Sequence, residues 1–501
     1  MDRGNHSLEN WLWEAACSIR GEIEAPKYKD FILPLVFIKR LSDVFEDELK
    51  ALSDDLSISE QLVNSDHSLV RFYIPEKARW SNIIKQVSSI GEYLTDAMRL
   101  LARENPQLQG VVDTVDFNQS TAGVRTIYDD SLKKLIQILD TKRLGLNDVD
   151  PDVLGRAYEY LLRKFAEGSG QSAGEFYTPM EVAQLMALIL DPMEGEEIYD
   201  PSCGTGGLLI KSNSVFKDKY SGKEGLNYPK FFGQEINKST YAMAKMNAII
   251  HDMQDSEIAI GDTMLRPGFK NEDGSLRKFD KVVANPMWNQ KFDQSVYKND
   301  PYGRFTFGYP PNNSADWGWI QHMLFSSKKR VVVVLDQGSL FRGGSEGKIR
   351  KGVIEKDLIE SVISLPEKLF YNTGAPASII VLNKSKDENR KGRILFINAS
   401  NEFGKHKEVR RLNQLYPEHI EKIVNAFRSF SNSEGFSSVR SIEDVEKNNG
   451  NLNVTLYVPP VTKEEQVDIR NVLSEISKVD NELKEVDEKL NKYLKELGYI
   501  D

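Results

Sequence analysis

Ile198-Tyr199-Asp200-Pro201-Ser202-Cys203-Gly204-Thr205-Gly206-Gly207 is the stretch that sets the fold of this chain. A short apolar strand runs into an acid and a glycine-rich turn, and the residues from Leu208 onward predict a helix. Beyond this point, apolar runs of strand length alternate with helical segments. This alternation is typical of a parallel, doubly wound sheet with helices on its faces. The predicted fold class is therefore α/β.

Seven further strands are predicted within residues 231–235, 258–262, 279–285, 330–335, 358–365, 378–382 and, as an edge strand, 394–397. Four of the predicted strands end in a polar side chain: Asp200, Glu235, Asp262 and Asn285. In doubly wound sheets, ligands bind at the carboxyl ends of the strands. The four side chains therefore predict a ligand site at this edge of the sheet.

The stretch Asn285-Pro286-Met287-Trp288 follows the apolar run 279–284. The Asn285 side-chain oxygen and the Pro286 carbonyl are two acceptors, and an indole stands beside them. This set suits a planar exocyclic amino group, which the acceptors would hold by its hydrogens while the ring stacks on the base. The alternative is a strand and turn with a core tryptophan, and the stretch taken alone favours that alternative.

The glycine-rich turn lacks the third glycine of a dinucleotide fingerprint, and no phosphate-binding loop of a nucleotide motor occurs in the chain. The turn instead lets the backbone approach a small cofactor closely. Glu235 is placed to accept from both ribose hydroxyls, and Asp262 to accept from an adenine amino group. Ribose, adenine and a charged amino-acid tail together describe S-adenosylmethionine.

Residues 8–145 are predicted to be helical, because apolar residues recur at helical spacing. A further helix at 153–162 and a flexible loop at 168–174 precede Glu175-Phe176-Tyr177-Thr178-Pro179. Thr178 is the expected N-cap, and Pro179 the first residue, of a helix from Met180 to Leu190. Phe176 and Tyr177 have two interpretations. They are ordinary packing residues, or they belong to a loop that covers a small ligand.

The C-terminal segment carries an apolar seam in steps of three and four, with charged residues between: Ile469, Val472, Ile476, Val479, Leu483, Val486, Leu490, Tyr493 and Leu497. Sustained for about four heptads, this spacing is that of a coiled-coil helix. The alternative is a single helix packed on its own domain. The strict spacing favours pairing with another helix, in this chain or in a partner.

The 501 residues are 40% hydrophobic and 28% charged, which indicates two or three globular domains. Neither a signal peptide nor an apolar span long enough for a bilayer is expected, and two cysteines without zinc-site spacing indicate a reducing cytoplasm and no metal. The net charge of −10 does not exclude DNA as a ligand, but it suggests that a partner supplies much of the grip on phosphates.

Successive motifs of this chain resemble those of amino-methyltransferases that act on DNA, in the order of adenine-N6 enzymes: 175–179, 200–207, 233–235, 261–263 and 285–286. The helical N-terminal segment, Leu340-Phe-Arg-Gly-Gly344 and Leu369-Phe-Tyr-Asn-Thr-Gly374 narrow the resemblance to the modification (M) subunit of type I restriction–modification systems. The resemblance covers nearly the whole chain and is weakest in about the last eighty residues.

The resemblance implies a helical N-terminal domain (1–150), a Rossmann-like S-adenosylmethionine-dependent methyltransferase domain (151–425) and a C-terminal region with the heptad helix for subunit docking (426–501). It implies a catalytic set of Asn285, Pro286 and Trp288, which would hold a flipped-out adenine for methylation at N6. The implied cofactor-binding residues are Glu175, Phe176, Tyr177, Thr178, Pro179, Met180, Asp200, Gly204, Thr205, Gly206, Gly207, Glu235 and Asp262.

The resemblance also implies partners: double-stranded DNA, a specificity (S) subunit that chooses the sequence, a second copy of the M subunit and a motor and nuclease (R) subunit. One departure stands out, because Met287 occupies a position where these enzymes usually carry a second proline. We expect it to alter loop stiffness and to leave activity intact. The alternatives are a protein or RNA N-methyltransferase on the same fold, and a non-catalytic assembly scaffold.

Overall fold

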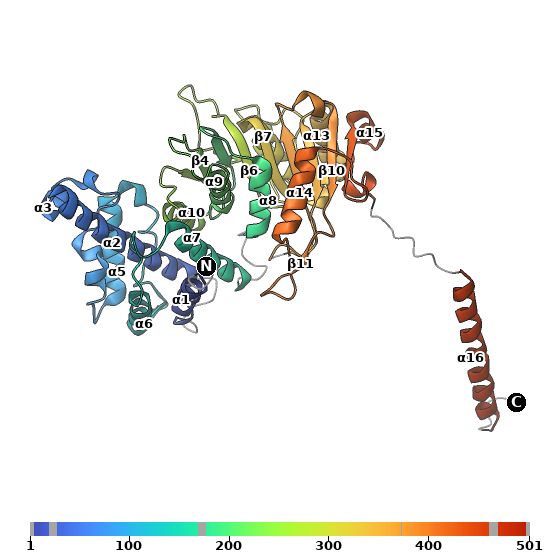
Figure 1. Cartoon of the computed structure of the whole chain (residues 1–501), viewed down its shortest axis with the longest axis horizontal. Helices are drawn as coiled ribbons and strands as arrows, with labels where there is room; N and C mark the ends of the chain where they lie inside the picture. The colour runs from blue at the N-terminus through green and yellow to red at the C-terminus, as the bar shows by residue number, and fades with distance from the viewer. Residues whose placement is uncertain (1–4, 20–27, 169–176, 372, 460–468, 497–501) are drawn as a thin grey trace. The chain divides into compact units, whose positions relative to one another are not determined.

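The computed structural model describes residues 5–19, 28–168, 177–371, 373–459 and 469–496 (Figure 1). The chain divides into two compact units, Met1–Val458 and Pro459–Asp501. Within the described residues, no helix combines the length and the apolar character needed to cross a membrane.

The N-terminal part of the first unit is helical, as predicted. Its helices share one apolar core, in which the predicted stripe Leu94, Met98 and Leu101 is fully buried. The two-residue strands β1 (Ser120–Thr121) and β2 (Val124–Arg125) form a small hairpin here. The helices are α1 (Asn5–Cys17), α2 (Tyr28–Leu56), α3 (Glu60–Ser65), α4 (Trp80–Ile83), α5 (Ile90–Glu104), α6 (Asp129–Asp140) and α7 (Pro151–Gly168).

A nine-stranded sheet forms the centre of the described remainder, in the order β13-β10-β8-β9-β7-β6-β3-β4-β5. All eight predicted strands are present. The strands are β3 (Glu197–Asp200), β4 (Lys230–Glu235), β5 (Glu257–Ile260), β6 (Phe279–Ala284), β7 (Ser327–Asp336), β8 (Ile359–Ser364), β9 (Ala377–Asn383), β10 (Arg393–Asn398) and β13 (Ser437–Ser441). The strands from β5 to β7 run parallel, which confirms the doubly wound half that carries the predicted site.

Two details of the sheet differ from the prediction. β9 runs antiparallel to both β7 and β8, so the sheet is mixed. The apolar strand 394–397 is not an edge, because β13 pairs along its outer side. β13 was missed because its sequence, Ser-Ser-Val-Arg-Ser, has a single apolar residue.

Helices cover both faces of the sheet (Figure 1). One face packs against α8 (Met180–Leu190), α9 (Gly207–Lys219) and α14 (Pro417–Ser429). The other packs against α12 (Asp316–Ser326), α13 (Gly344–Glu355) and α15 (Ile442–Lys447). Helix α10 (Lys238–Ile250) contributes Met243 and Met246 to the core of the N-terminal helices, and Ala248 to the core under the sheet. It therefore joins the two cores.

The second unit contains the helix α16 (Ile469–Glu496), so the predicted C-terminal helix is confirmed. Its described seam residues Ile476, Val479, Leu483, Val486 and Leu490 are 51–62% exposed. The pairing of this seam with another helix stays a prediction.

Candidate functional site

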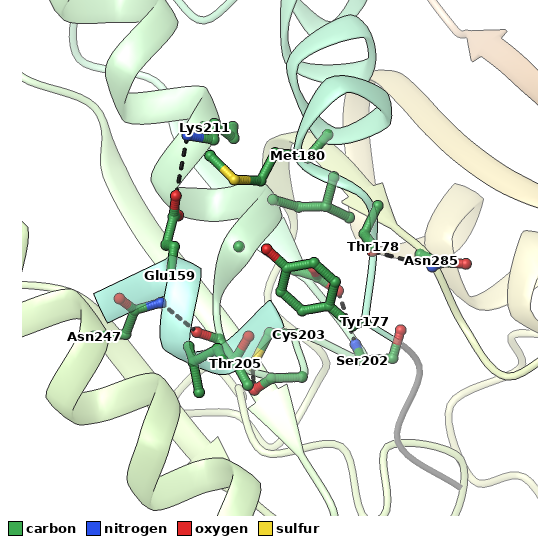
Figure 2. Close-up of a pocket in the computed structure, with 16 residues that line it drawn as sticks. Glu159, Tyr177, Thr178, Met180, Ser202, Cys203, Thr205, Lys211, Asn247 and Asn285 are labelled. Carbon is green, nitrogen blue, oxygen red and sulfur yellow. Dashed lines mark hydrogen bonds and ion pairs between the residues drawn. The ribbon is translucent and has the colours of Figure 1, made fainter. Parts of the chain in front are cut away.

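A pocket lies at the carboxyl ends of the central strands, where the sequence places it (Figure 2). Helices α7, α9 and α10, the segment before α8, the turn after β3 and the end of β6 all contribute to its wall. The lining residues are Glu159, Leu162, Tyr177, Thr178, Met180, Ala183, Asp200, Ser202, Cys203, Gly204, Thr205, Gly207, Leu208, Lys211, Asn247 and Asn285.

The glycine-rich turn leaves backbone at the pocket wall. Gly204 and Gly206 have φ of 55° and 82°, which glycine adopts without strain. A Cβ on Gly207 would meet no atom within 4 Å, and because Gly207 lines the pocket, a side chain there would enter it. The turn is braced by Asn247 on α10, whose Nδ2 donates to the Thr205 carbonyl at 3.0 Å.

The three acids at the strand ends differ in their surroundings. Asp200 is buried, and burial, with a smaller contribution from Glu235, raises the pKa of its carboxyl to about 8. Glu235 accepts from the Gly204 and Asn237 backbone amides at 3.0 and 2.8 Å. Asp262 lies two residues beyond β5, outside the strand predicted to contain it, and accepts from two backbone amides of the following turn.

Asn285 is the first residue after β6, and both ends of its amide are engaged. Its Nδ2 donates to Thr178 Oγ1 at 3.0 Å, and its Oδ1 accepts from the Trp288 indole at 3.1 Å. Because an indole N–H can only donate, the Asn285 oxygen must be the atom that faces Trp288. The prediction that Thr178 is the N-cap of α8 is wrong. Pro179 holds that position and the Thr178 hydroxyl contacts the Asn285 amide.

Trp288 is half-buried beside Asn285. Its indole N–H also donates to the Val334 carbonyl at 3.2 Å, and Phe370 meets its ring edge-on at 4.9 Å between centroids. Met287 is 36% exposed, so its side chain lies outside the core. The stacking of Trp288 on a base stays a prediction.

The structure brings most of the predicted site residues together. Eight line the pocket: Tyr177, Thr178, Met180, Asp200, Gly204, Thr205, Gly207 and Asn285. Pro179, Gly206 and Pro286 adjoin lining residues in the chain, Glu235 bonds to the glycine-rich turn and Asp262 follows the next strand. Trp288 does not line the pocket, but its indole N–H donates to Asn285, which does. Glu175 and Phe176 lie outside the described residues.

Four polar lining residues were missed: Glu159, Ser202, Lys211 and Asn247. Lys211 stands one helical turn after Gly207, so the spacing of α9 could have indicated that it faces the site. Glu159 and Asn247 are carried by α7 and α10, and no local pattern sets them apart from ordinary helix residues.

The pocket has the chemistry that a cationic nucleoside cofactor requires. Its acceptors include the Glu159 carboxylate and the carboxyl group of Asp200. Ser202 Oγ and Asn247 Oδ1 are buried and lack a hydrogen-bond partner within the described residues. Buried polar atoms are normally paired, so the two atoms indicate a place for a ligand. These acceptors and the open glycine backbone both fit S-adenosylmethionine.

Two family models match the chain. One described as N-6 DNA Methylase matches residues 149–466, and one described as HsdM N-terminal domain matches residues 8–139. The chain is 39% identical to the type I restriction enzyme MjaVII methylase subunit of Methanocaldococcus jannaschii, over 94% of this chain and 80% of that protein. It is 37% identical to the MjaVIII methylase subunit of the same organism, over 97% and 84%.

Solved structures agree with these sequence relatives. The type I restriction–modification system methyltransferase subunit from Streptococcus thermophilus superimposes with a TM-score of 0.78 at 29% identity, over 91% of this chain and 100% of that chain. A structure of a type I restriction–modification system matches with a TM-score of 0.64 at 20% identity, over 98% and 99% of the two chains, which shows a shared fold.

Proposed function

Because this chain belongs to the N-6 DNA methylase family, with the methylase subunits of type I restriction enzymes, we propose that it transfers a methyl group from S-adenosylmethionine to N6 of an adenine in DNA. The observation that carries the proposal is the orientation of Asn285. Its amide is fixed between Thr178 and Trp288 at the pocket wall, next to the glycine-rich turn.

Asn285 Oδ1 keeps one lone pair beyond the bond to Trp288, because an amide oxygen accepts two hydrogen bonds. That lone pair and the Pro286 carbonyl are the two acceptors for the hydrogens of N6. Holding both hydrogens draws the nitrogen lone pair out of conjugation with the ring. Inside a duplex the amino group is out of reach, so the adenine must be flipped out of the stack.

The residues proposed to hold the cofactor are those of the glycine-rich turn, Glu235 for the ribose and Asp262 for the adenine. S-adenosylmethionine supplies the electrophilic methyl group, and the protein supplies position. A strong general base is not required, because the N6 proton can leave once the nitrogen has become cationic. Burial raises the pKa of Asp200 to about 8, so this carboxyl is mostly protonated at neutral pH.

We further propose that the chain acts within an assembly. A specificity subunit would choose the DNA sequence, a second copy of this chain would flank it, and a motor and nuclease subunit would join for restriction. The net charge of −10 agrees with a division in which other subunits supply much of the contact with phosphates. As a modification enzyme of cellular DNA it would work in the cytoplasm.

The test is methyl transfer from radiolabelled cofactor to DNA by the full chain with its cognate specificity subunit, followed by nucleoside analysis. We expect label in N6-methyladenine. We expect Asn285→Ala to abolish incorporation while leaving the Kd for S-adenosylhomocysteine within about threefold, because Asn285 serves the base. Label only in RNA or protein would support the alternative methyltransferases. Cofactor binding without methylation of DNA, RNA or protein would support a non-catalytic assembly scaffold.

A further inference from the structure

An ion pair lines the pocket away from Asn285. Lys211 Nζ on α9 lies 3.2 Å from Glu159 Oε2 on α7, and the two side chains are only 13% and 4% exposed. Figure 2 shows the pair on the opposite side of Tyr177 from Asn285. Burying both charges is costly, so a pair that only joined two helices would gain little over apolar packing.

Asn247 adds an unsatisfied acceptor at the same end of the pocket. The side chain is 1% exposed, its Nδ2 is used by the Thr205 carbonyl, and its Oδ1 has no partner within the described residues. His251 Nε2 lies 3.9 Å from Glu159 Oε1, but burial lowers the imidazole pKa to about 4. Lys211 is therefore the cation that pairs with Glu159. Asn247 Oδ1 can accept a hydrogen bond from a ligand.

We propose that Lys211, Glu159 and Asn247 form the binding site for the α-amino-acid end of the cofactor, with Lys211 binding the carboxylate and Glu159 and Asn247 binding the ammonium. This inference rests on the proposed function, since it concerns the same cofactor. When the cofactor binds, the ion pair between Lys211 and Glu159 separates. Lys211 then pairs with the carboxylate of the amino-acid tail, and Glu159 pairs with its ammonium group. Asn247 Oδ1 gains the donor that it lacks.

The layout of the pocket supports this assignment. Glu235 and Asp262, proposed for the ribose and the adenine, do not line the pocket, whereas Asn285, the proposed acceptor of the target amine, does. The lined space therefore runs from the methyl-transfer position to the ion pair. In S-adenosylmethionine, the group on the far side of the sulfur from the adenosine is the amino-acid tail.

The assignment is tested by the binding of three nucleosides to the full chain, measured by calorimetry. S-adenosylhomocysteine has the complete tail, S-adenosyl-3-thiopropylamine keeps the ammonium without the carboxylate, and 5′-methylthioadenosine has neither. The variants are Lys211→Met and Glu159→Gln. Lys219→Met is the matched control, because Lys219 lies on the same helix and is paired with Asp191 outside the pocket.

We expect Lys211→Met to weaken S-adenosylhomocysteine about 10-fold or more, as the loss of a charged hydrogen bond does, and not to weaken the amine analogue. We expect Glu159→Gln to weaken both ligands that carry the ammonium. Neither variant should change the Kd for 5′-methylthioadenosine more than about twofold, and this also shows that the pocket is folded. Lys219→Met should bind all three nucleosides as the parent chain does.

Equal losses for all three nucleosides would show that the ion pair is structural and would overturn the tail site. Unchanged S-adenosylhomocysteine affinity in Lys211→Met would overturn it as well. Both results leave the proposed function standing, because the parent chain still binds the cofactor product. Failure of the parent chain to bind S-adenosylhomocysteine would contradict the cofactor assignment itself, and the tail site with it.

Discussion

Thr178 helps to fix the orientation of the Asn285 side-chain amide. The Thr178 hydroxyl accepts from Asn285 Nδ2, and the segment that carries Thr178 also lines the pocket. One side chain therefore connects the segment proposed to cover the cofactor to the amide proposed to hold the base. We expect Thr178→Val to lower the methylation rate about 10-fold, because a buried amide N–H loses its partner and the amide can turn. The Kd for S-adenosylhomocysteine should change less than the rate.

Thr178→Ser keeps the hydroxyl and is the matched control, which should stay within about threefold of the parent rate. Single-turnover methylation and calorimetry measure the two quantities separately. If Thr178→Val lost rate and affinity in equal proportion, Thr178 would act on the cofactor alone and not through Asn285.

Asp200 makes stability depend on pH. Its folded pKa is about 8, against an ordinary value of 3.8, because the carboxyl is buried. Between these values the folded state holds a proton that the unfolded state has lost, so the free energy of unfolding contributed by this group falls as pH rises from about 4 to 8. We expect urea unfolding at several pH values to show this decline, and Asp200→Asn to flatten it. Parallel pH profiles for the two proteins would contradict the assignment.

At the scale of elements, the loop after β6 is held by charges from three other segments. Asn289, with φ of 53°, donates its backbone N–H to Asp316 on α12 at 2.9 Å and its side-chain amide to Asp336 at the end of β7. Arg342 bonds to both carboxylates and to Glu346. One guanidinium thus pairs with both carboxylates that anchor Asn289, the residue after Trp288.

We expect Arg342→Met to destabilise the protein by about 3 kcal/mol, because it leaves buried Asp316 without a counter-charge. Methylation should fall more than cofactor affinity, since the anchored loop carries Pro286 and Trp288. The double variant Arg342→Met with Asp316→Asn removes the unpaired charge and should regain part of the stability. Urea unfolding measures both. No recovery in the double variant would mean that Arg342 acts through Glu346 or Asp336 instead.

Eight of the nine strands of the central sheet were predictable because apolar runs mark them, and four of these runs end in a polar residue of the predicted site. The parallel direction of the strands from β5 to β7 was predicted, whereas the antiparallel direction of β9 was not. β9 is buried along its whole length and carries four consecutive apolar residues, Ile379 to Leu382, so its pattern is the same for either direction. Thr178 looked like an N-cap because capping is local, whereas its true partner, Asn285, lies 107 residues away. Charged helix residues such as Glu159 and Lys211 resemble a solvated face until the fold brings them together.

At the scale of the whole molecule, α10 joins the N-terminal helices to the pocket. Its two faces enter the core of the N-terminal helices and the core under the sheet, and Ser239 on this helix donates to Asp30 on α2 at 2.8 Å. The same helix carries Asn247, which braces the glycine-rich turn. The N-terminal helices and the pocket are therefore parts of one packed body.

The sequence of helix α16 predicts pairing with another helix. The five seam residues whose side chains the structure describes are exposed, although exposing a row of branched side chains to water is unfavourable. We expect Leu483→Glu with Val486→Glu to abolish co-purification with the specificity subunit, because the two seam residues would place charge in a coiled-coil core. Thermal stability and S-adenosylhomocysteine binding of the isolated chain should not change, since the pocket residues all lie in the first unit.

Asn481→Glu with Asn491→Glu is the matched control. Both asparagines are exposed on α16 and fall between the seam positions, so the control adds the same two charges outside the predicted contact. It should retain the specificity subunit and DNA methylation, whereas the seam variant loses both. Retention of the specificity subunit by the seam variant would refute the docking role. Loss in both pairs would show that net charge matters and the seam does not. Size-exclusion chromatography of the mixed subunits at two salt concentrations distinguishes these outcomes, because a charge effect weakens with salt and an apolar contact does not.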